Sequence, residues 1–514
     1  MDGEASSNEV SVNIFLPSGR SITVSILRTQ TCGELGEIAQ TSFGRGFLRL
    51  LSADGHFLHP DDSLQSAGVE DGSNLTAVAQ IPRLIATQLA FAIWTSGGPA
   101  VAWGDPEAGG DCEMHGKHVK SVQELVAAEY AIAAIMTNGQ VVSWGDPCSG
   151  GYVWDARLRD VKELVATDDA FAALREDGTV VTFGDPSVDC SSLQLKGVVK
   201  LSASSAAFAA ILSTGAVVTW GKADFGGNSS QVQDQLRNVK EIVGKIHNSA
   251  FTALGEDGQV LATWGSSRCC ASKEVLKQLK NVKVKNIDCT ALAWAAVSQN
   301  GEVFTWGMPC SGGDSRDVQD RLQNVTKVVA SHAAFAALLE DGSVVSWGDP
   351  LFGGDDFEVR AELKNIVKLF SCYNMFLAIR QDGKAIRWGN PAVNEIWEHH
   401  GGHLEVEPLL GNLQDFAGND RAFAAVLTDG SVLSWGDPKT GGDNKELQET
   451  IECILGSRVP TPYEPSSEKS TGESGDSDTS DVSDGLKEHG GTVTRTTEAR
   501  SAACPLPPRT MSGI

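Results

Sequence analysis

One sequence unit recurs nine times in this chain and dominates it. The clearest copies read AFAALLEDGSVVSWGDP (334–350) and AFAAVLTDGSVLSWGDP (422–438). Each copy ends in an aromatic anchor residue, and eight steps separate position 103 from position 435, a mean period of 41.5 residues. A period of this size is typical of propellers, solenoids and repeat arrays. The anchors are Trp103, Trp144, Phe183, Trp220, Trp264, Trp306, Trp347, Trp388 and Trp435.

The spacing inside each unit predicts a hairpin with one further strand. A large apolar residue lies seven positions before a glycine, and in most units the anchor lies five positions after it. The pair Asp177-Gly178 is typical, and such pairs accept positive φ at both residues, which predicts a type I′ turn. An apolar run such as VKELVA (161–166) precedes each hairpin. Trp264 lies six positions after Gly258, and this extra residue predicts a β-bulge.

The two faces of each predicted sheet are apolar, because alanines alternate with one large ring. Such a sheet requires a copy of itself on either side, and radial stacking provides one. We therefore predict a mainly β, multi-bladed propeller over residues 82–455, built from nine repeat units. Three closures stay open: a ring of nine blades, a ring of seven with outlying repeats, and an open spiral.

The repeated core DG-x-V-x-x-WG resembles the regulator of chromosome condensation and the propellers of large HECT-type ubiquitin ligases. The resemblance covers 82–455 and implies a protein-binding propeller; family rings usually have seven blades. It also implies guanine-nucleotide exchange on a small GTPase as an alternative function. A HECT ligase needs a catalytic lobe after the propeller, whereas a low-complexity segment follows here. A recognition subunit of a ubiquitin ligase is the second alternative.

Residues 10–80 form a different unit. Alternating apolar residues predict a hairpin from VSVNIFL (10–16) and SITVSIL (21–27), and TCGELGEIAQTSF (31–43) predicts a helix capped by its threonine. FLRLLS (47–52) and NLTAVAQ (74–80) predict two further strands. This order resembles ubiquitin, so we expect a β-grasp domain over 10–80 after a flexible segment at 1–9.

The likeness to ubiquitin implies a recognition module that docks onto ubiquitin or proteasome machinery. The positions that match the apolar recognition patch of ubiquitin are Pro17, Leu51, Thr76 and Val78. The segment continues into Gln80-Ile81-Pro82 in place of the terminal Gly-Gly that conjugation requires. We therefore expect an embedded domain and not a modifier.

Composition limits the remaining function classes. The net charge of −25 opposes nucleic acid and anionic membranes and favours basic protein partners. Eleven cysteines without regular spacing indicate reduced thiols in the cytoplasm or nucleus. No apolar run approaches the roughly 18–20 residues of a membrane span. Residues 459–514 are rich in Ser and acids, which predicts disorder, and Ser477 and Ser480 suit an acid-directed kinase.

Motifs of catalysis and metal binding are weak. The sequence has no G-x-S-x-G elbow, no P-loop and no G-x-G-x-x-G turn between a strand and a helix. The sets Cys112/His115/His118 and His399/His400/His403 lack a second cluster at zinc spacing, so we expect solvated loops. The adjacent pair Cys269-Cys270 has no histidine near it in the sequence.

We therefore expect a non-enzymatic interaction scaffold or adaptor without a cofactor. The long loop 390–412 and the acidic residues Asp355, Asp356 and Glu362 are the predicted partner contacts. The oligomeric state is left open.

Overall fold

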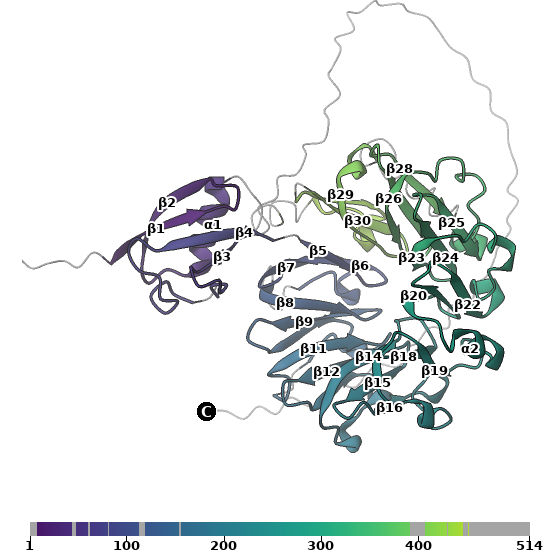
Figure 1. The fold of residues 1–514 in the computed structure, drawn as a ribbon. Coiled ribbons are helices and arrows are strands. Elements are labelled where there is room, and N and C mark those ends of the chain that lie inside the picture. Colours follow the sequence, from purple (N-terminus) through teal and green to yellow (C-terminus); the bar gives the residue numbers. More distant parts are fainter. Residues whose placement is uncertain are drawn as a thin grey trace, which may run out of the picture. The chain divides into compact units, whose positions relative to one another are not determined.

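The computed structural model describes residues 8–43, 48–59, 62–80, 82–112, 119–153, 156–390, 407–428, 430–445 and 451. These residues form one small mixed sheet with a helix, followed by a series of small antiparallel sheets (Figure 1). No helix among them is long and apolar enough to cross a lipid bilayer.

The N-terminal unit is a β-grasp domain. Its elements are β1 (Glu9–Phe15), β2 (Ser21–Leu27), α1 (Cys32–Phe43), β3 (Leu48–Leu51) and β4 (Asn74–Ala79). The sheet order is β2-β1-β4-β3, with β1 and β4 parallel and the other pairs antiparallel. Helix α1 begins with the predicted threonine cap, because Thr31 Oγ1 accepts the Glu34 N–H at 3.2 Å and Glu34 Oε2 accepts the Thr31 N–H at 2.7 Å.

The repeats fold into nine blades of three antiparallel strands each, and the first two blades join into one six-stranded sheet because the last strand of blade 1 pairs with the first strand of blade 2. Blades 1 to 3 are β5 (Arg83–Ala86), β6 (Ala90–Trp94) and β7 (Gly98–Gly104); β8 (Val119–Ala127), β9 (Ala131–Met136) and β10 (Val141–Gly145); β11 (Val161–Ala166), β12 (Ala170–Arg175) and β13 (Val180–Gly184). Blades 4 to 6 are β14 (Val198–Ala203), β15 (Ala207–Leu212) and β16 (Val217–Gly221); β17 (Val239–Val243), β18 (Ala250–Gly255) and β19 (Val260–Gly265); β20 (Val284–Cys289), β21 (Ala293–Ser298) and β22 (Val303–Gly307). Blades 7 to 9 are β23 (Val325–Ala330), β24 (Ala334–Leu339) and β25 (Val344–Gly348); β26 (Ile366–Ser371), β27 (Met375–Arg380) and β28 (Ala385–Gly389); β29 (Leu413–Gly418), β30 (Ala422–Leu427) and β31 (Val432–Gly436).

Short helical segments connect the blades. Most follow the anchor as a 3-10 turn that begins at a proline, such as Pro350–Phe352, where Asp349 Oδ1 accepts the Leu351 N–H at 2.9 Å. Between blades 5 and 6 the connection contains α2 (Lys273–Leu279), which Ser272 caps. The bulge predicted in the fifth unit is confirmed, because the register of β18 and β19 shifts around Leu261.

The type of hairpin turn predicted from the sequence is wrong. Gly178 has φ +77°, but Asp177 does not have positive φ, so the turn is not type I′. Arg175 and Thr179 pair, and Gly178 donates its N–H to Arg175 O at 2.9 Å, which leaves a loop of three residues. This is a type I turn followed by a left-handed glycine, the usual form of a three-residue hairpin loop. Asp177 Oδ1 accepts the Thr179 N–H at 3.0 Å and so stabilises the turn.

Each blade packs a ring face against a face of small apolar residues of the preceding blade, mostly alanine, although blade 9 packs against Met375 and Leu377 of blade 8. In blade 4, Phe208 and Trp220 lie opposite each other on β15 and β16, with ring centroids 5.4 Å apart. This pair packs against Ala170 and Ala172 of blade 3. Alternation along a strand puts the large ring and the alanines on opposite faces, so every blade presents both surfaces.

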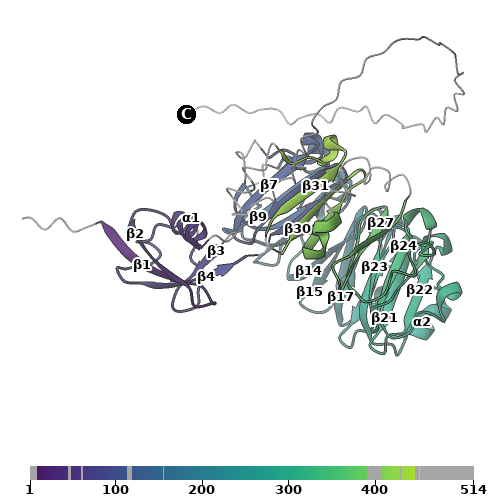
Figure 2. The same cartoon turned by 90° about the horizontal axis from the view of Figure 1, so that it is seen from above.

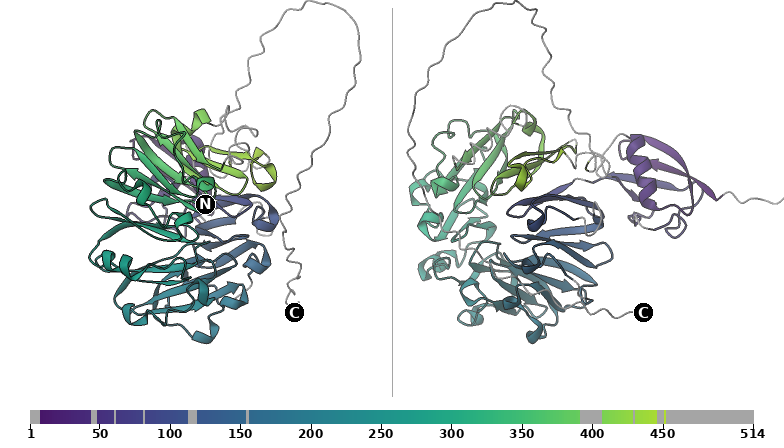
Figure 3. Two further views of the ribbon diagram at one scale, coloured as in Figure 1. Left: turned by 90° about the vertical axis from the view of Figure 1, so that its right-hand side faces the viewer. Right: turned by 180° about the vertical axis from the view of Figure 1, so that it is seen from behind.

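The same packing closes the ring between blades 9 and 1. Trp103 of blade 1 packs against Ala422 and Ala424 of blade 9, and the Leu84 N–H donates to Asp415 Oδ2 at 3.0 Å. Figures 1 and 2 show β30 beside the strands of blade 1, and Figure 3 shows the blades from two further sides. The chain therefore forms a nine-bladed β-propeller, and the seven-bladed ring and the open spiral are excluded.

Several sequence predictions lie outside the described residues. They concern the first seven residues, the histidines at 115, 118, 399, 400 and 403, most of the long eighth loop (391–406), and the segment 459–514 with Ser477 and Ser480.

Candidate functional site at the ring axis

The loops between the first and second strands of the blades meet at the ring axis, where those of seven blades line one pocket. In every blade the residue three positions before the large apolar residue of the second strand lies in this loop. These nine axial residues are Gln88, Glu129, Asp168, Ser205, Asn248, Ala291, His332, Tyr373 and Asp420.

Backbone hydrogen bonds join the axial residues from blade to blade. Seven of the nine axial N–H groups donate to the carbonyl of the axial residue in the next blade, for example from Glu129 to Asp168 at 2.9 Å and from His332 to Tyr373 at 3.0 Å. The donor and acceptor positions are 88–129, 129–168, 168–205, 205–248, 291–332, 332–373 and 420–88. The last pair connects blade 9 to blade 1. Because the backbone is held in this way, the side chains at the axis are well positioned.

The axial pocket has a volume of about 270 Å³. Its lining comes from seven blades and includes Gln88, Glu129, His247, His332, Tyr373 and Asp420. Lys245 also lines the pocket, but its Nζ lies 3.2 Å from Asp288 Oδ1, so its positive charge is already paired with that carboxylate.

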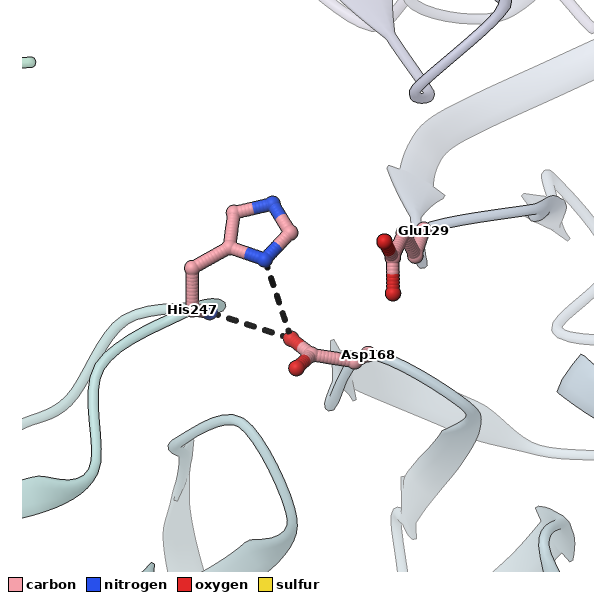
Figure 4. A group of neighbouring side chains, drawn as sticks. All are labelled: Glu129, Asp168 and His247. Atoms are coloured by element: carbon pink, nitrogen blue, oxygen red, sulfur yellow. Dashed lines mark hydrogen bonds and ion pairs between the residues drawn. The ribbon is translucent and has the colours of Figure 1, made fainter. Parts of the chain in front are cut away.

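Glu129, Asp168 and His247 form a cluster of ligand-type side chains in this region (Figure 4). One donor atom from each lies within 4.8 Å of the other two. Asp168 Oδ1 accepts the backbone N–H of His247 at 3.0 Å and lies 3.5 Å from His247 Nδ1. The three residues come from blades 2, 3 and 5, and all three are half-buried.

His247 reaches this cluster because its loop is longer than the corresponding loops. Val239 and Phe251 are 12 positions apart, whereas the equivalent Val161 and Phe171 are 10 apart. The two extra residues lengthen the loop that leads to Asn248, the axial residue of this blade. His247 lies in this longer loop and has a left-handed φ of +68°. A left-handed φ at a non-glycine residue is uncommon, and here the bond to Asp168 stabilises it.

Nearby positively charged groups do not balance the negative charge of the carboxylates at the axis. Burial and the nearby carboxylates of Asp168, Asp169 and Asp420 raise the pKa of Glu129 to about 7. Burial also raises the pKa of Asp168, although the imidazole of His247 opposes this change. The pKa of Asp420 is raised by burial as well. A bound cation would therefore stabilise this group of side chains.

Aromatic side chains also line the pocket. The rings of His332 and Tyr373 lie 4.3 Å apart, and the ring of His247 meets that of Tyr373 edge-on at 5.8 Å. Burial and the neighbouring His247 lower the pKa of His332 to about 4. Burial and the axial carboxylates raise the pKa of Tyr373 to about 12. Both side chains are consequently neutral at physiological pH.

The predicted anchor tryptophans lie between the blades and not in the pocket. They are 0–5% exposed, and Phe183 is half-buried. In five of them Nε1 donates to the carbonyl of the first glycine of a Gly-Gly pair in the preceding blade. The pairs are Trp103–Gly441, Trp144–Gly109, Trp264–Gly226, Trp347–Gly312 and Trp388–Gly353. The anchors therefore have a structural role.

The structure places the predicted ubiquitin-like patch on one sheet of the β-grasp domain. Leu51 and Thr76 are register partners on β3 and β4, and Val78 lies two positions along β4. All three are half-buried, and Pro17 is exposed in the turn between β1 and β2.

The acidic partner contact predicted at Asp356 is wrong. Its side chain is 1% exposed and forms ion pairs with Arg321 at 2.8 Å and Arg360 at 2.6 Å. Glu362 forms an ion pair with Lys384. These two carboxylates therefore hold the connector of blade 8 in place, and Asp355 alone of the predicted three is free of an ion pair among the described residues.

The thiols of Cys269 and Cys270 are not activated. Burial raises the pKa of Cys269 to about 11, and it also raises the pKa of Cys270. A nucleophilic cysteine needs the opposite shift, because the thiolate is the reactive form.

Sequence reasoning missed the axial residues, although two signals were present. The axial position is polar or charged in most units, while the alanine two positions later hardly varies. The second signal is the two-residue insertion that contains His247.

Comparisons with known proteins give only distant structural matches. No family model and no curated protein matches the chain. Among solved structures, the Crinkly ectodomain of the receptor kinase ACR4 from Arabidopsis thaliana is 13% identical, with a TM-score of 0.32 over 61% of this chain and 95% of that one. Prp20p from Saccharomyces cerevisiae is 15% identical, with a TM-score of 0.33 over 65% of this chain and 84% of that one. A designed protein based on ubiquitin is 24% identical over 14% of this chain and 89% of its own, with a TM-score of 0.13. At these TM-scores the assignment of the fold depends on the sheets and their packing in this chain.

Proposed function

We propose that this protein is a non-enzymatic scaffold that binds a protein partner at the axial pocket. The observation that carries the proposal is the contrast between the core and the axis. The nine blades use nearly the same residues where they pack on each other, whereas the nine axial side chains differ in charge, size and polarity. Varied side chains on a rigid frame are what specific recognition requires.

The partner that we propose is basic. The chain has a net charge of −25, so its electrostatic field attracts a basic protein surface from a distance. The axial carboxylates place further negative charge in the pocket itself. The binding rate should consequently fall as salt is added.

Filling the pocket tests this proposal. Ala291→Trp places a large ring at a half-buried position of the lining, and Val199→Trp places the same ring at a 50% exposed position of β14 outside the lining. Proteins captured by the unmodified chain should be retained by Val199→Trp and lost by Ala291→Trp. An identical set of captured proteins for all three chains would contradict binding at the axis.

We further propose that the β-grasp domain links the scaffold to ubiquitin or proteasome machinery. Leu51, Thr76 and Val78 lie together on its sheet and support this proposal. Affinity capture with the full chain and with a chain lacking residues 1–81 tests it. Proteasomal or ubiquitin-binding proteins should be lost with the domain, and an unchanged set would refute the link.

We also propose that the protein works in the cytoplasm or nucleus. The buried thiols Cys32, Cys190 and Cys289 form no disulfide, which suits a reducing compartment. Imaging of the tagged full chain would decide this point.

A further inference from the structure

We propose that Glu129, Asp168 and His247 bind one divalent transition-metal ion, with Zn²⁺ as the representative ion. This inference goes beyond the proposed scaffold function and does not depend on it. It rests on the kind of donor atoms, their distances and their surroundings.

The donor atoms suit zinc better than the alkaline-earth ions. Zn²⁺ is commonly held by three protein ligands that combine imidazole nitrogen and carboxylate oxygen, with a fourth position for water or another group. Ca²⁺ requires about six to eight oxygen ligands and Mg²⁺ prefers oxygen, and neither favours an imidazole. The cluster supplies one imidazole and two carboxylates.

The donor atoms lie near enough to one another for one ion to bring them together. Zinc lies about 2.0–2.2 Å from its nitrogen and oxygen ligands, so ligand atoms in a tetrahedral site are roughly 3.3–3.6 Å apart. His247 Nδ1 and Asp168 Oδ1 already have this separation, at 3.5 Å. The donor atoms of Glu129, Asp168 and His247 lie within 4.8 Å of one another. Binding therefore requires the three side chains to draw together by about 1 Å at most, which side-chain rotation allows.

The ligands are already positioned by hydrogen bonds. Asp168 accepts the His247 backbone N–H, and the hydroxyl of Ser205 donates to the Asp168 carboxylate. The backbone N–H of Glu129 donates to the Asp168 carbonyl at 2.9 Å. Such outer contacts orient metal ligands and increase affinity. Little conformational entropy is therefore lost when the ion binds.

The surroundings favour a cation. Asp169 and Asp420 add negative charge near Glu129, and the lysine of the pocket, Lys245, is paired with Asp288. A divalent ion would compensate the two ligand carboxylates.

The experiment is zinc titration of the metal-free full chain by calorimetry. Histidines 56, 59, 115, 118, 399, 400 and 403 are first replaced by alanine, which removes the other histidines that lie close together in the sequence. In that background we expect one zinc ion per chain, and His247→Asn and Glu129→Gln should each weaken binding at least ten-fold. Mg²⁺ and Ca²⁺ should not compete. Equal zinc affinity in His247→Asn, or no zinc site in the background chain, would overturn the proposal.

Two further measurements separate ligand loss from misfolding. Glu129→Gln relieves repulsion between carboxylates, so its melting temperature in chelator should not fall, while the rise caused by zinc should disappear. Co²⁺ in the same site should show no thiolate-to-metal charge-transfer band, because no cysteine belongs to the cluster. A strong band of that kind would assign the ion to a cysteine and refute the site.

Discussion

The indole Nε1 of Trp103 donates a hydrogen bond to the carbonyl oxygen of Gly441 at 3.0 Å, across 338 residues of the chain. Other neighbouring blades are joined by the same bond, for example between Trp144 and Gly109 at 2.9 Å. Among the described residues, it is found wherever the connector before a tryptophan-anchored blade contains a Gly-Gly pair. Blade 9 is therefore attached to blade 1 in the same way as consecutive blades are attached to each other. The ring closes by repeating its internal contact and needs no blade shared between its two ends.

Replacing Trp103 by phenylalanine should destabilise the propeller more than the same change at Trp220. Trp103→Phe leaves the buried Gly441 carbonyl without its donor, which costs about 1–3 kcal/mol beyond the lost ring area. Nε1 of Trp220 has no acceptor among the described residues, since no Gly-Gly pair precedes it, so Trp220→Phe loses only packing. Urea unfolding of both variants measures the difference, and equal losses would argue against the bond.

Replacing Gly442 by alanine should strongly destabilise the closure of the ring between blades 9 and 1. A Cβ at this position would lie 2.3 Å from the Gly436 carbonyl carbon, which is backbone and cannot rotate away. We expect a loss of about 3 kcal/mol or more from Gly442→Ala. Gly383→Ala is the control, because it has φ +89° and its Cβ would meet Gly411 Cα only at an ordinary contact distance of 3.5 Å, so it should lose about 1–2 kcal/mol through backbone strain. Thermal unfolding would reveal whether close approach is the larger effect.

Removing the Asp356 carboxylate should leave two arginines without their partner. We expect Asp356→Ala to lower the free energy of unfolding by about 1–3 kcal/mol, because the buried Ser346 N–H loses its acceptor and two partly exposed arginines lose their ion pairs. Glu358→Ala, at an exposed position two residues away, should change stability by less than about 0.5 kcal/mol. If partner binding fell in Asp356→Ala without any loss of stability, the structural role would be refuted.

Protonation of His332 in acid should lower the free energy of unfolding. Its pKa is about 4 in the folded protein and 6.5 without the fold, so the folded state binds fewer protons between these values. The contribution of His332 is therefore fully present above pH 6.5 and is lost as the pH falls toward 4. Glu129 acts in the opposite sense, because its raised pKa makes the folded state bind more protons between about pH 7 and 4.5.

A His332→Phe variant isolates this contribution. His247 and Tyr373, which face the ring, are unchanged in the variant, and a chelator keeps the axial cluster free of metal. The unfolding free energy of the unmodified chain should fall more steeply between pH 6.5 and 4 than that of the variant. Parallel curves, or an imidazole that titrates near pH 6.5 by NMR, would contradict a buried neutral His332.

Local patterns predicted most of each blade. The strands, the threonine cap at Thr31 and the bulge at Leu261 follow from periodicity and spacing within a few residues. The predicted type of the hairpin turn was wrong, because an Asp-Gly pair suits both a type I′ turn and a type I turn that ends in a left-handed glycine. Loop length decides between the two, and it depends on the register of strands on either side.

The amino-acid sequence by itself determined the repeat, the apolar faces and hence the stacking of blades. Only the tertiary structure decided that nine blades close a ring, because closure depends on the small angle between neighbouring sheets, which accumulates over every interface. It also decided that Glu129, Asp168 and His247 meet, since each is an ordinary polar loop residue along the chain. Their proximity is a long-range consequence of the ring, and no local pattern encodes it.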